Sequence, residues 1–165
     1  MVVKAVSENK TNVMRILSQK KISYTAHEYP HGDTAVDGIT VAKITGLPPE
    51  KVFKTLVCRG ASKAVYVFCI PVSAELDLKK AAKAAGEKSV AMVPVSEITG
   101  LTNYVRGGCS PVGMKKLYPT FFHRTVDDIS SVVVSAGKIG YQVELDPNEL
   151  LKLINAAKAD IITEV

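Results

Sequence analysis

Lys54 lies within a strongly apolar segment, Val-Phe-Lys-Thr-Leu-Val at positions 52–57. If the segment is a strand, alternation places the Lys54 side chain on the same face as Val52, Leu56 and Cys58. An unpaired ammonium group on an apolar face is costly, so the side chain must face a pocket, a charged partner or solvent. The position therefore indicates either a pocket lysine or an edge-strand lysine that prevents association between strands, and both interpretations stay open.

A glycine pair followed by a helix-start pattern occupies positions 107–111, Gly-Gly-Cys-Ser-Pro. Ser110 is expected to cap a helix that has Pro111 as its first residue. Free amide groups at such a start would bind an anion or stabilise an oxyanion, and Gly107 and Gly108 would let a ligand approach the backbone. The alternative is a tight turn that requires a positive φ angle.

The cysteines and histidines offer weaker candidates. Cys109 could be a nucleophile with a lowered pKa at the expected helix start, with His123 as its base, but a small apolar packing role is the simpler interpretation. The three cysteines are widely spaced without a Cys-x-x-Cys pair, which argues against disulfides and structural zinc. His27 and His31 are four residues apart, but Pro30 prevents the helix that would align them on a metal ion.

The segment Ser-Ala-Gly-Lys-Ile-Gly at positions 135–140 resembles a phosphate-binding loop in composition. It lacks the spacing of that motif, so a hairpin turn is predicted instead.

Periodicity and capping residues predict the elements that would position these side chains. A β-hairpin is expected because two β-branched and aromatic runs flank residues 60–63. The predicted fold is therefore of the α/β class, α+β in type, with a mixed, largely antiparallel sheet flanked by helices in one domain, residues 1–165. The helices are expected at residues 9–21, 36–45, 77–85 and 146–157, with a helical turn at 95–99, and the strands at 22–28, 52–59, 64–71, 89–93, 120–123, 131–136 and 141–145.

The charge balance and the apolar runs limit the function classes. The chain has 165 residues and a net charge of +5, which permits a nucleic-acid partner without identifying one. It has no apolar run of about 20 residues and no signal-peptide pattern at Met1 to Lys10, so a cytoplasmic location and no membrane partner are expected.

A family pattern is carried by four segments taken in order, Val52 to Val57, Leu76 to Ala81, Arg106 to Gly113 and Val134 to Lys138. Together they resemble the YbaK/EbsC family of aminoacyl-tRNA editing deacylases. The resemblance extends from about residue 9 to residue 162, and the ordered combination is more specific than any single motif. Two positions differ from some members, Ala74 where an asparagine can occur and Gln142 where an aspartate can occur.

The resemblance implies hydrolysis of Cys-tRNA(Pro), the product of an error by prolyl-tRNA synthetase. It also implies that Lys54 is the essential residue, holding the aminoacyl ester or the adjacent phosphate. The alternatives are deacylation of another tRNA mischarged with Ala, Ser or Thr, and non-catalytic binding of the aminoacylated CCA end. The substrate-binding residues implied by the resemblance are Tyr29, Thr55, Gly107, Gly108, Ser110 and Ser135.

The expected partners follow from the same resemblance. They are the acceptor end of aminoacyl-tRNA and prolyl-tRNA synthetase, because a chain this small, with a radius of gyration of about 15 Å, cannot read both ends of a tRNA. No cofactor or metal ion is expected, since an aminoacyl ester is already activated. No DNA partner is expected either. The resemblance further suggests that the cysteine of the substrate attacks its own ester and leaves as a thiolactone.

Overall fold

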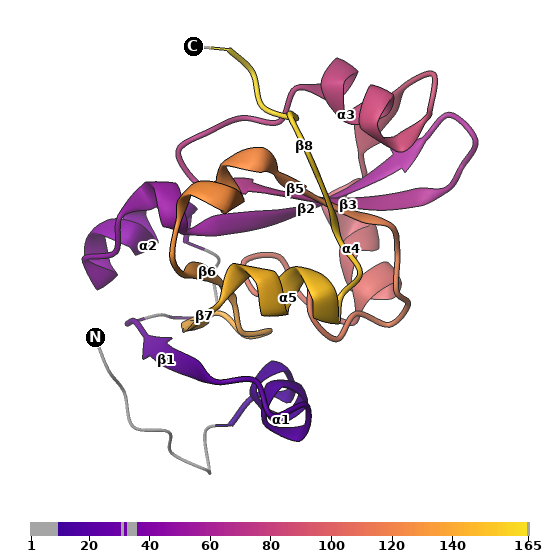
Figure 1. Cartoon of the computed structure of the whole chain (residues 1–165). Coiled ribbons are helices and arrows are strands. Elements are labelled where there is room, and N and C mark those ends of the chain that lie inside the picture. The colour runs from indigo at the N-terminus through magenta and orange to yellow at the C-terminus, as the bar shows by residue number, and fades with distance from the viewer. Residues whose placement is uncertain (1–9, 31, 33–35, 165) are drawn as a thin grey trace.

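The computed structural model describes residues 10–30, 32 and 36–164, and five α-helices and eight strands lie within these residues. Helices and strands alternate irregularly along the chain, as predicted, and Figure 1 shows their arrangement. The elements are α1 (Asn12–Gln19), β1 (Tyr24–Glu28), α2 (Gly38–Thr45), η2 (Pro49–Lys51), β2 (Phe53–Gly60), β3 (Val65–Pro71), α3 (Leu78–Ala85), β4 (Val90–Met92), α4 (Val95–Thr102), β5 (Thr120–His123), η3 (Arg124–Asp128), β6 (Val132–Ser135), β7 (Tyr141–Leu145), α5 (Pro147–Leu153) and β8 (Ala157–Ala159).

The strands form two sheets. One has three strands in the order β1-β7-β6, and all its pairings are antiparallel. The other has five strands in the order β4-β2-β3-β5-β8 and is mixed, because β5 runs parallel to both β3 and β8. An isolated parallel bridge between Val52 and Val133 connects the sheets. The predicted class is confirmed, and the strands are divided between two sheets instead of one.

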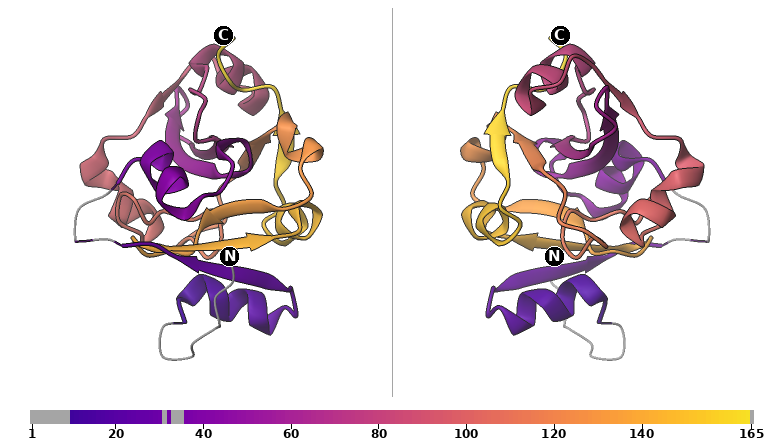
Figure 2. Two further views of the ribbon diagram at one scale, coloured as in Figure 1. Left: turned by 90° about the vertical axis from the view of Figure 1, so that its left-hand side faces the viewer. Right: turned by 90° about the vertical axis from the view of Figure 1, so that its right-hand side faces the viewer.

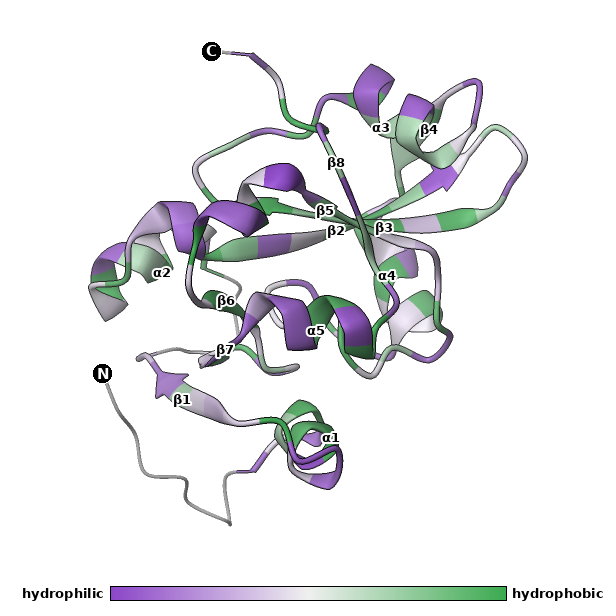
Figure 3. Cartoon of the chain, in the orientation of Figure 1, coloured by the Kyte–Doolittle hydropathy of each residue, from purple (hydrophilic) through white to green (hydrophobic). Residues whose placement is uncertain are grey.

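The five-stranded sheet is covered on both faces. Ala81 and Ala82 of α3 pack on one face against Phe68 and Ile70. The other face, which includes Phe53, packs against the three-stranded sheet, α1 and α5 in the larger core. Figure 2 shows these layers from two sides, and in Figure 3 the helices alternate between purple and green, as helices with one buried face do.

Local capping explains why most predicted helices occur. The side chains of Thr11, Asp37, Asp77 and Asp146 accept hydrogen bonds from amides in the first turns of α1, α2, α3 and α5. Gly46 and Gly86 end α2 and α3 in the left-handed conformation. The hairpin of β2 and β3 and the turn between β6 and β7 are also confirmed.

Two predictions about elements are wrong. No helix follows Ser110, since residues 108–119 contain neither helix nor strand. The last helix was expected to reach residue 157, but α5 ends at Leu153 and Asn155 has a φ of 53°, which turns the chain into β8. That strand pairs with β5, and a pairing so distant in sequence has no local signal.

No helix among the described residues is long and apolar enough to cross a bilayer.

Candidate functional site

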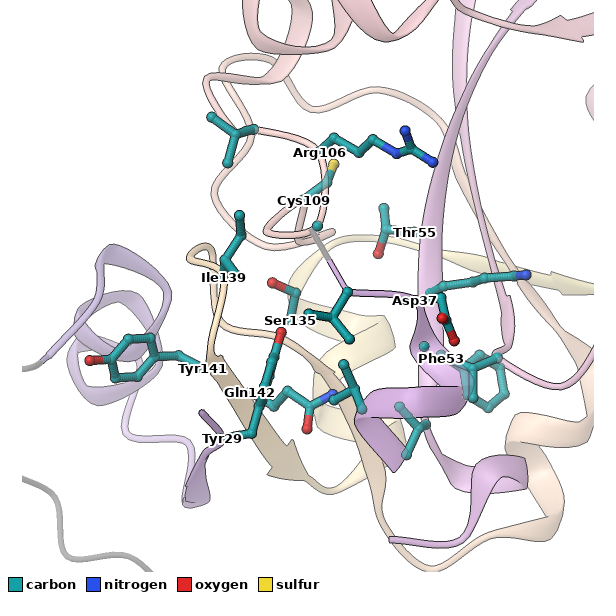
Figure 4. A pocket seen from close by; sticks show the side chains of 18 of the residues that line it. Tyr29, Asp37, Phe53, Thr55, Arg106, Cys109, Ser135, Ile139, Tyr141 and Gln142 are labelled. Atoms are coloured by element: carbon teal, nitrogen blue, oxygen red, sulfur yellow. The ribbon is translucent and has the colours of Figure 1, made fainter. Parts of the chain in front are cut away.

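A pocket of about 800 Å³ lies between the two sheets, at the start of β2. Its walls come from the first half of β2, the start of α2, the segment of residues 105–109, and the ends of β6 and β7 that face it (Figure 4). The residues that line it are Tyr29, Val36, Asp37, Gly38, Val41, Val52, Phe53, Lys54, Thr55, Leu56, Val72, Val105, Arg106, Gly107, Cys109, Ser135, Ile139, Tyr141 and Gln142.

Lys54 lies half-buried in the wall of the pocket, opposite Ile70 in the pairing of β2 with β3. Strand β4 pairs with β2 only at residues 58–60, so the first half of β2 has an open edge among the described residues. Lys54 therefore lies in a pocket and on a strand with an open edge. The pocket-lysine and the edge-strand interpretations are therefore both consistent with its position.

The acidic side chain of the pocket has hydrogen-bond partners, whereas its two basic side chains have none within the described residues. Within the described residues, neither Lys54 nor Arg106 makes a side-chain hydrogen bond or an ion pair. The carboxylate of Asp37 instead caps α2, accepting from the Thr40 amide and hydroxyl at 2.9 Å each, and these hydrogen bonds lower its pKa. The pocket thus presents two unmatched cations, an arrangement that suits a ligand carrying phosphate.

The glycine pair forms a tight turn, as the alternative interpretation predicted. The Gly108 amide donates to the Val105 carbonyl at 3.0 Å, and Gly107 has a φ of 88°, a conformation that favours glycine. The Gly108 amide is therefore already satisfied, while the Gly107 amide has no acceptor within the described residues. Only Gly107 of the pair lines the pocket.

Ser110 lies behind the pocket instead of in its lining. It is fully buried, and its hydroxyl oxygen accepts from the Val112 amide at 3.2 Å. The Val112 carbonyl in turn accepts from the hydroxyl of the buried Tyr104. The expected helix-start anion site is thus wrong, because these contacts close an irregular loop with no helix behind it.

The cysteines do not form a nucleophilic site. Cys109 lines the pocket, but burial raises the pKa of its thiol to about 11. Its expected base, His123, lies on β5, where its Nδ1 accepts from the Ile161 amide at 3.3 Å. Cys69 is buried and donates to Thr55 Oγ1 at 3.7 Å, and burial raises the pKa of Cys58 to about 12.

The histidines do not point to a metal site. His27 Nε2 lies 2.8 Å from Glu144 Oε1, so the ring is held by a carboxylate, and His31 lies outside the described residues. Among the residues that the structure describes, no cluster of three or more His, Cys, Asp or Glu side chains could hold a metal ion.

The pocket brings together Lys54, Tyr29, Thr55, Gly107 and Ser135 from the predicted set and leaves out Gly108 and Ser110. Sequence reasoning did not place Arg106 or Gln142 in the site. Arg106 had a signal, a basic residue directly before a glycine pair. Gln142 had one signal, its departure from family members that carry an aspartate at this position. Alternation along β7 does not reveal that one face borders a pocket.

The sequence resembles known proteins over nearly its whole length. Residues 32–153 match the family described as the aminoacyl-tRNA editing domain. The chain is 41% identical over 161 residues to a protein of Enterococcus faecalis provisionally named Cys-tRNA(Pro)/Cys-tRNA(Cys) deacylase EbsC, with 98% of both chains covered. A proline–tRNA ligase of Burkholderia orbicola is 27% identical over 131 residues, which are 73% of this chain and 23% of the ligase.

A solved structure described provisionally as a trans-editing enzyme for prolyl tRNA synthetase has the same fold. Its TM-score is 0.78 at 23% identity, and the match covers 92% of this chain and 97% of that chain. The resemblance inferred from the sequence is confirmed by the family match and by the relative that aligns over nearly the full length. The chain therefore belongs to the aminoacyl-tRNA editing domain family.

Proposed function

We propose that this protein deacylates mischarged aminoacyl-tRNA, with Cys-tRNA(Pro) as its substrate. The observation that carries the proposal is the pair of unmatched cations, Lys54 and Arg106, in a pocket of about 800 Å³ whose lining is otherwise largely apolar. The cations suit the terminal phosphate of the acceptor end, and the apolar part suits a small aminoacyl group. The name of the Enterococcus faecalis relative, similar over 98% of its length, supports the same substrate.

In the proposed reaction the substrate supplies its own nucleophile. The thiol sulfur of the cysteinyl group attacks the ester carbon, the bond to the ribose oxygen breaks, and the ribose hydroxyl leaves with the thiol proton. Water then opens the resulting thiolactone to free cysteine. Orientation alone can supply an effective molarity of roughly 10⁵ to 10⁸ M for such an intramolecular step. The raised pKa of Cys109 favours this route over attack by the enzyme.

The pocket residues would hold the substrate in its reactive conformation. Lys54 would bind the ester or the adjacent phosphate as a cation, and the Gly107 amide, which has no acceptor within the described residues, would donate to the developing oxyanion. Tyr29, Thr55 and Ser135 would border the aminoacyl group. Gly108 would support the turn that presents Gly107, and Ser110 would hold the loop behind it.

The proposed partners are tRNA and prolyl-tRNA synthetase, and the proposed location is the cytoplasm, where aminoacyl-tRNA is used. A protein with a radius of gyration of about 15 Å, expected for a chain of this length, is too small to contact both ends of one tRNA. The similarity to part of a proline–tRNA ligase supports a synthetase that holds the tRNA while this protein removes the amino acid.

The test is incubation of the protein with Cys-tRNA(Pro) labelled in the amino acid, with Ala-, Ser- and Thr-tRNA as parallel substrates. We expect release of labelled cysteine at a rate well above that of the other amino acids. Faster release of another amino acid would reassign the substrate. An ester that persists in a stable complex would contradict catalysis and identify a binding module for the CCA end.

A further inference from the structure

Gln142 lies in the wall of the pocket on a polar strip of the three-stranded sheet. Alternation places it on the same face of β7 as Glu144, while Val143 and Leu145 face the core. Its cross-strand neighbours are Ser135 on β6 and His27 on β1. Its side chain is only 7% exposed, and Figure 4 shows it beside Ser135 at the pocket.

The Oε1 atom of Gln142 is buried and has no hydrogen-bond donor within the described part of the chain. The neighbouring polar groups already have partners. His27 Nε2 is held by Glu144 Oε1 at 2.8 Å, and Ser135 Oγ accepts from the Gly137 amide at 3.1 Å. A buried amide oxygen without a donor is destabilising, and such groups usually find a partner. Because this oxygen belongs to a pocket residue, a bound ligand can supply that donor.

The ligand group that fits this oxygen is a neutral donor. A buried ammonium group requires a charged partner, and Asp37, the carboxylate of the described lining, is exposed and occupied by Thr40. Lys54 and Arg106 add positive charge to the same pocket. A thiol or hydroxyl hydrogen can be satisfied by an amide oxygen without bringing a further positive charge into the pocket.

We propose that Gln142 Oε1 accepts the polar hydrogen of the aminoacyl side chain and so distinguishes cysteine from an aminoacyl group of the same shape without a donor. This inference rests on the proposed function, because it assumes that the pocket receives an aminoacyl group. Apolar walls discriminate weakly between groups of similar size, whereas a buried acceptor left unpaired penalises the wrong substrate. Gln142 is therefore a specificity-determining residue.

The experiment measures binding without hydrolysis. The probes are two analogues of the terminal adenosine, 3′-amino-3′-deoxyadenosine joined through a stable amide to cysteine or to 2-aminobutyrate, in which a methyl group replaces the thiol. Dissociation constants are measured by calorimetry for the wild-type protein, for Gln142→Met and for the control Gln19→Met, an exposed glutamine at the end of α1. We expect the wild type and the control to bind the cysteine analogue about tenfold more tightly than the aminobutyrate analogue, and Gln142→Met to bind both equally.

The outcomes separate this inference from the proposed function. Equal affinity of the wild type for the two analogues overturns the role of Gln142, and this arm decides the question even if Gln142→Met fails to fold. The proposal is also overturned if folded Gln142→Met binds both analogues more weakly by the same factor. Gln142 would then contact a group that the two analogues share. A preserved cysteine preference in a protein that does not hydrolyse Cys-tRNA(Pro) would refute the deacylase function and support the selectivity of Gln142.

Discussion

Lys51 Nζ lies 2.7 Å from Glu144 Oε2, and this ion pair joins the last residue of η2, two positions before β2, to the next-to-last residue of β7. Both side chains are about four-fifths buried, with 21% and 19% of their surfaces exposed. Ser131 and His27 also hydrogen-bond to the Glu144 carboxylate. The cluster therefore connects the two sheets beside the pocket and holds the start of β2, where Lys54 lies.

The stability of the protein should decrease in acid through Glu144. Burial raises the pKa of Glu144, but hydrogen bonds from Lys51, Ser131 and His27 outweigh it and lower the pKa to about 2, below the ordinary value of 4.5. The folded state thus favours the ionised form, and its stabilisation is complete above pH 4.5 and is lost as the pH falls through 2. The shift corresponds to about 3 kcal/mol in the free energy of unfolding.

Urea unfolding between pH 2 and pH 7 checks this prediction. Glu144→Gln should lose stability at pH 7 and show a weaker dependence on pH in the acid range. The control Glu50→Gln changes an exposed side chain of the neighbouring turn and should behave like the wild type. An unchanged acid dependence in Glu144→Gln would show that other groups govern acid unfolding.

Lys54→Ala should lose deacylation while retaining the fold. The side chain is half-buried and has no ion pair within the described residues, so its removal leaves no buried partner unsatisfied. Loss of a preorganised charge contact to substrate typically costs ~10²-fold in rate. Single-turnover deacylation together with circular dichroism measures both properties. Lys63→Ala, in the turn between β2 and β3, is the matched control. Near-native turnover by a folded Lys54→Ala would exclude a central role for Lys54.

Gly108→Ala should distort the pocket although Gly108 does not line it. An added Cβ would lie 3.0 Å from the Ile139 nitrogen and 3.1 Å from the Lys138 carbonyl carbon, so the backbone beside Ile139 must shift. We expect a loss of about tenfold in activity, since small displacements of positioning groups reduce rates strongly. Gly100→Ala, which meets no atom within 4 Å, is the control. Equal activity of the two variants would mean that the turn tolerates the added carbon.

Replacing all three cysteines by serine should leave deacylation largely intact if the fold persists. Cys58 and Cys69 are buried in the core, and the Cys109 thiol has a raised pKa, so none is suited to attack an ester. Product analysis should detect a cysteine thiolactone, and Ser-tRNA should react far more slowly because its hydroxyl is a weaker nucleophile. A covalent aminoacyl group on Cys109 would establish an enzyme nucleophile instead.

Binding of tRNA by the protein alone should be weak and sensitive to salt. Lys54 and Arg106 are the cations of the pocket, and contacts between cations and phosphates release counterions. Filter binding of tRNA(Pro) at increasing salt should show a steep decrease in affinity, and Arg106→Gln should reduce the slope. Tight, salt-insensitive selection of tRNA(Pro) by the isolated protein would remove the need for a synthetase partner.

The amino-acid sequence alone determined the elements whose signals lie within a few residues. Asp77 and Gly86 mark both ends of α3, and Asp146 with Pro147 marks the start of α5, because caps act through local hydrogen bonds. The prediction from local caps was wrong at Ser110, where a serine before a proline indicated a helix that the structure does not contain. There the buried hydroxyl of Tyr104 and the loop contacts of Val112 determine the conformation.

The tertiary structure decided which residues meet. Glu144 hydrogen-bonds to His27, 117 positions away in sequence, and the pairing of β8 with β5 forms without a local pattern. Alternation along β7 predicts that Gln142 and Glu144 share a face, but only the packing of the two sheets leaves Glu144 with partners and Gln142 Oε1 without one among the described residues. Contacts across the core depend on how whole layers pack, and no short stretch of sequence contains that information.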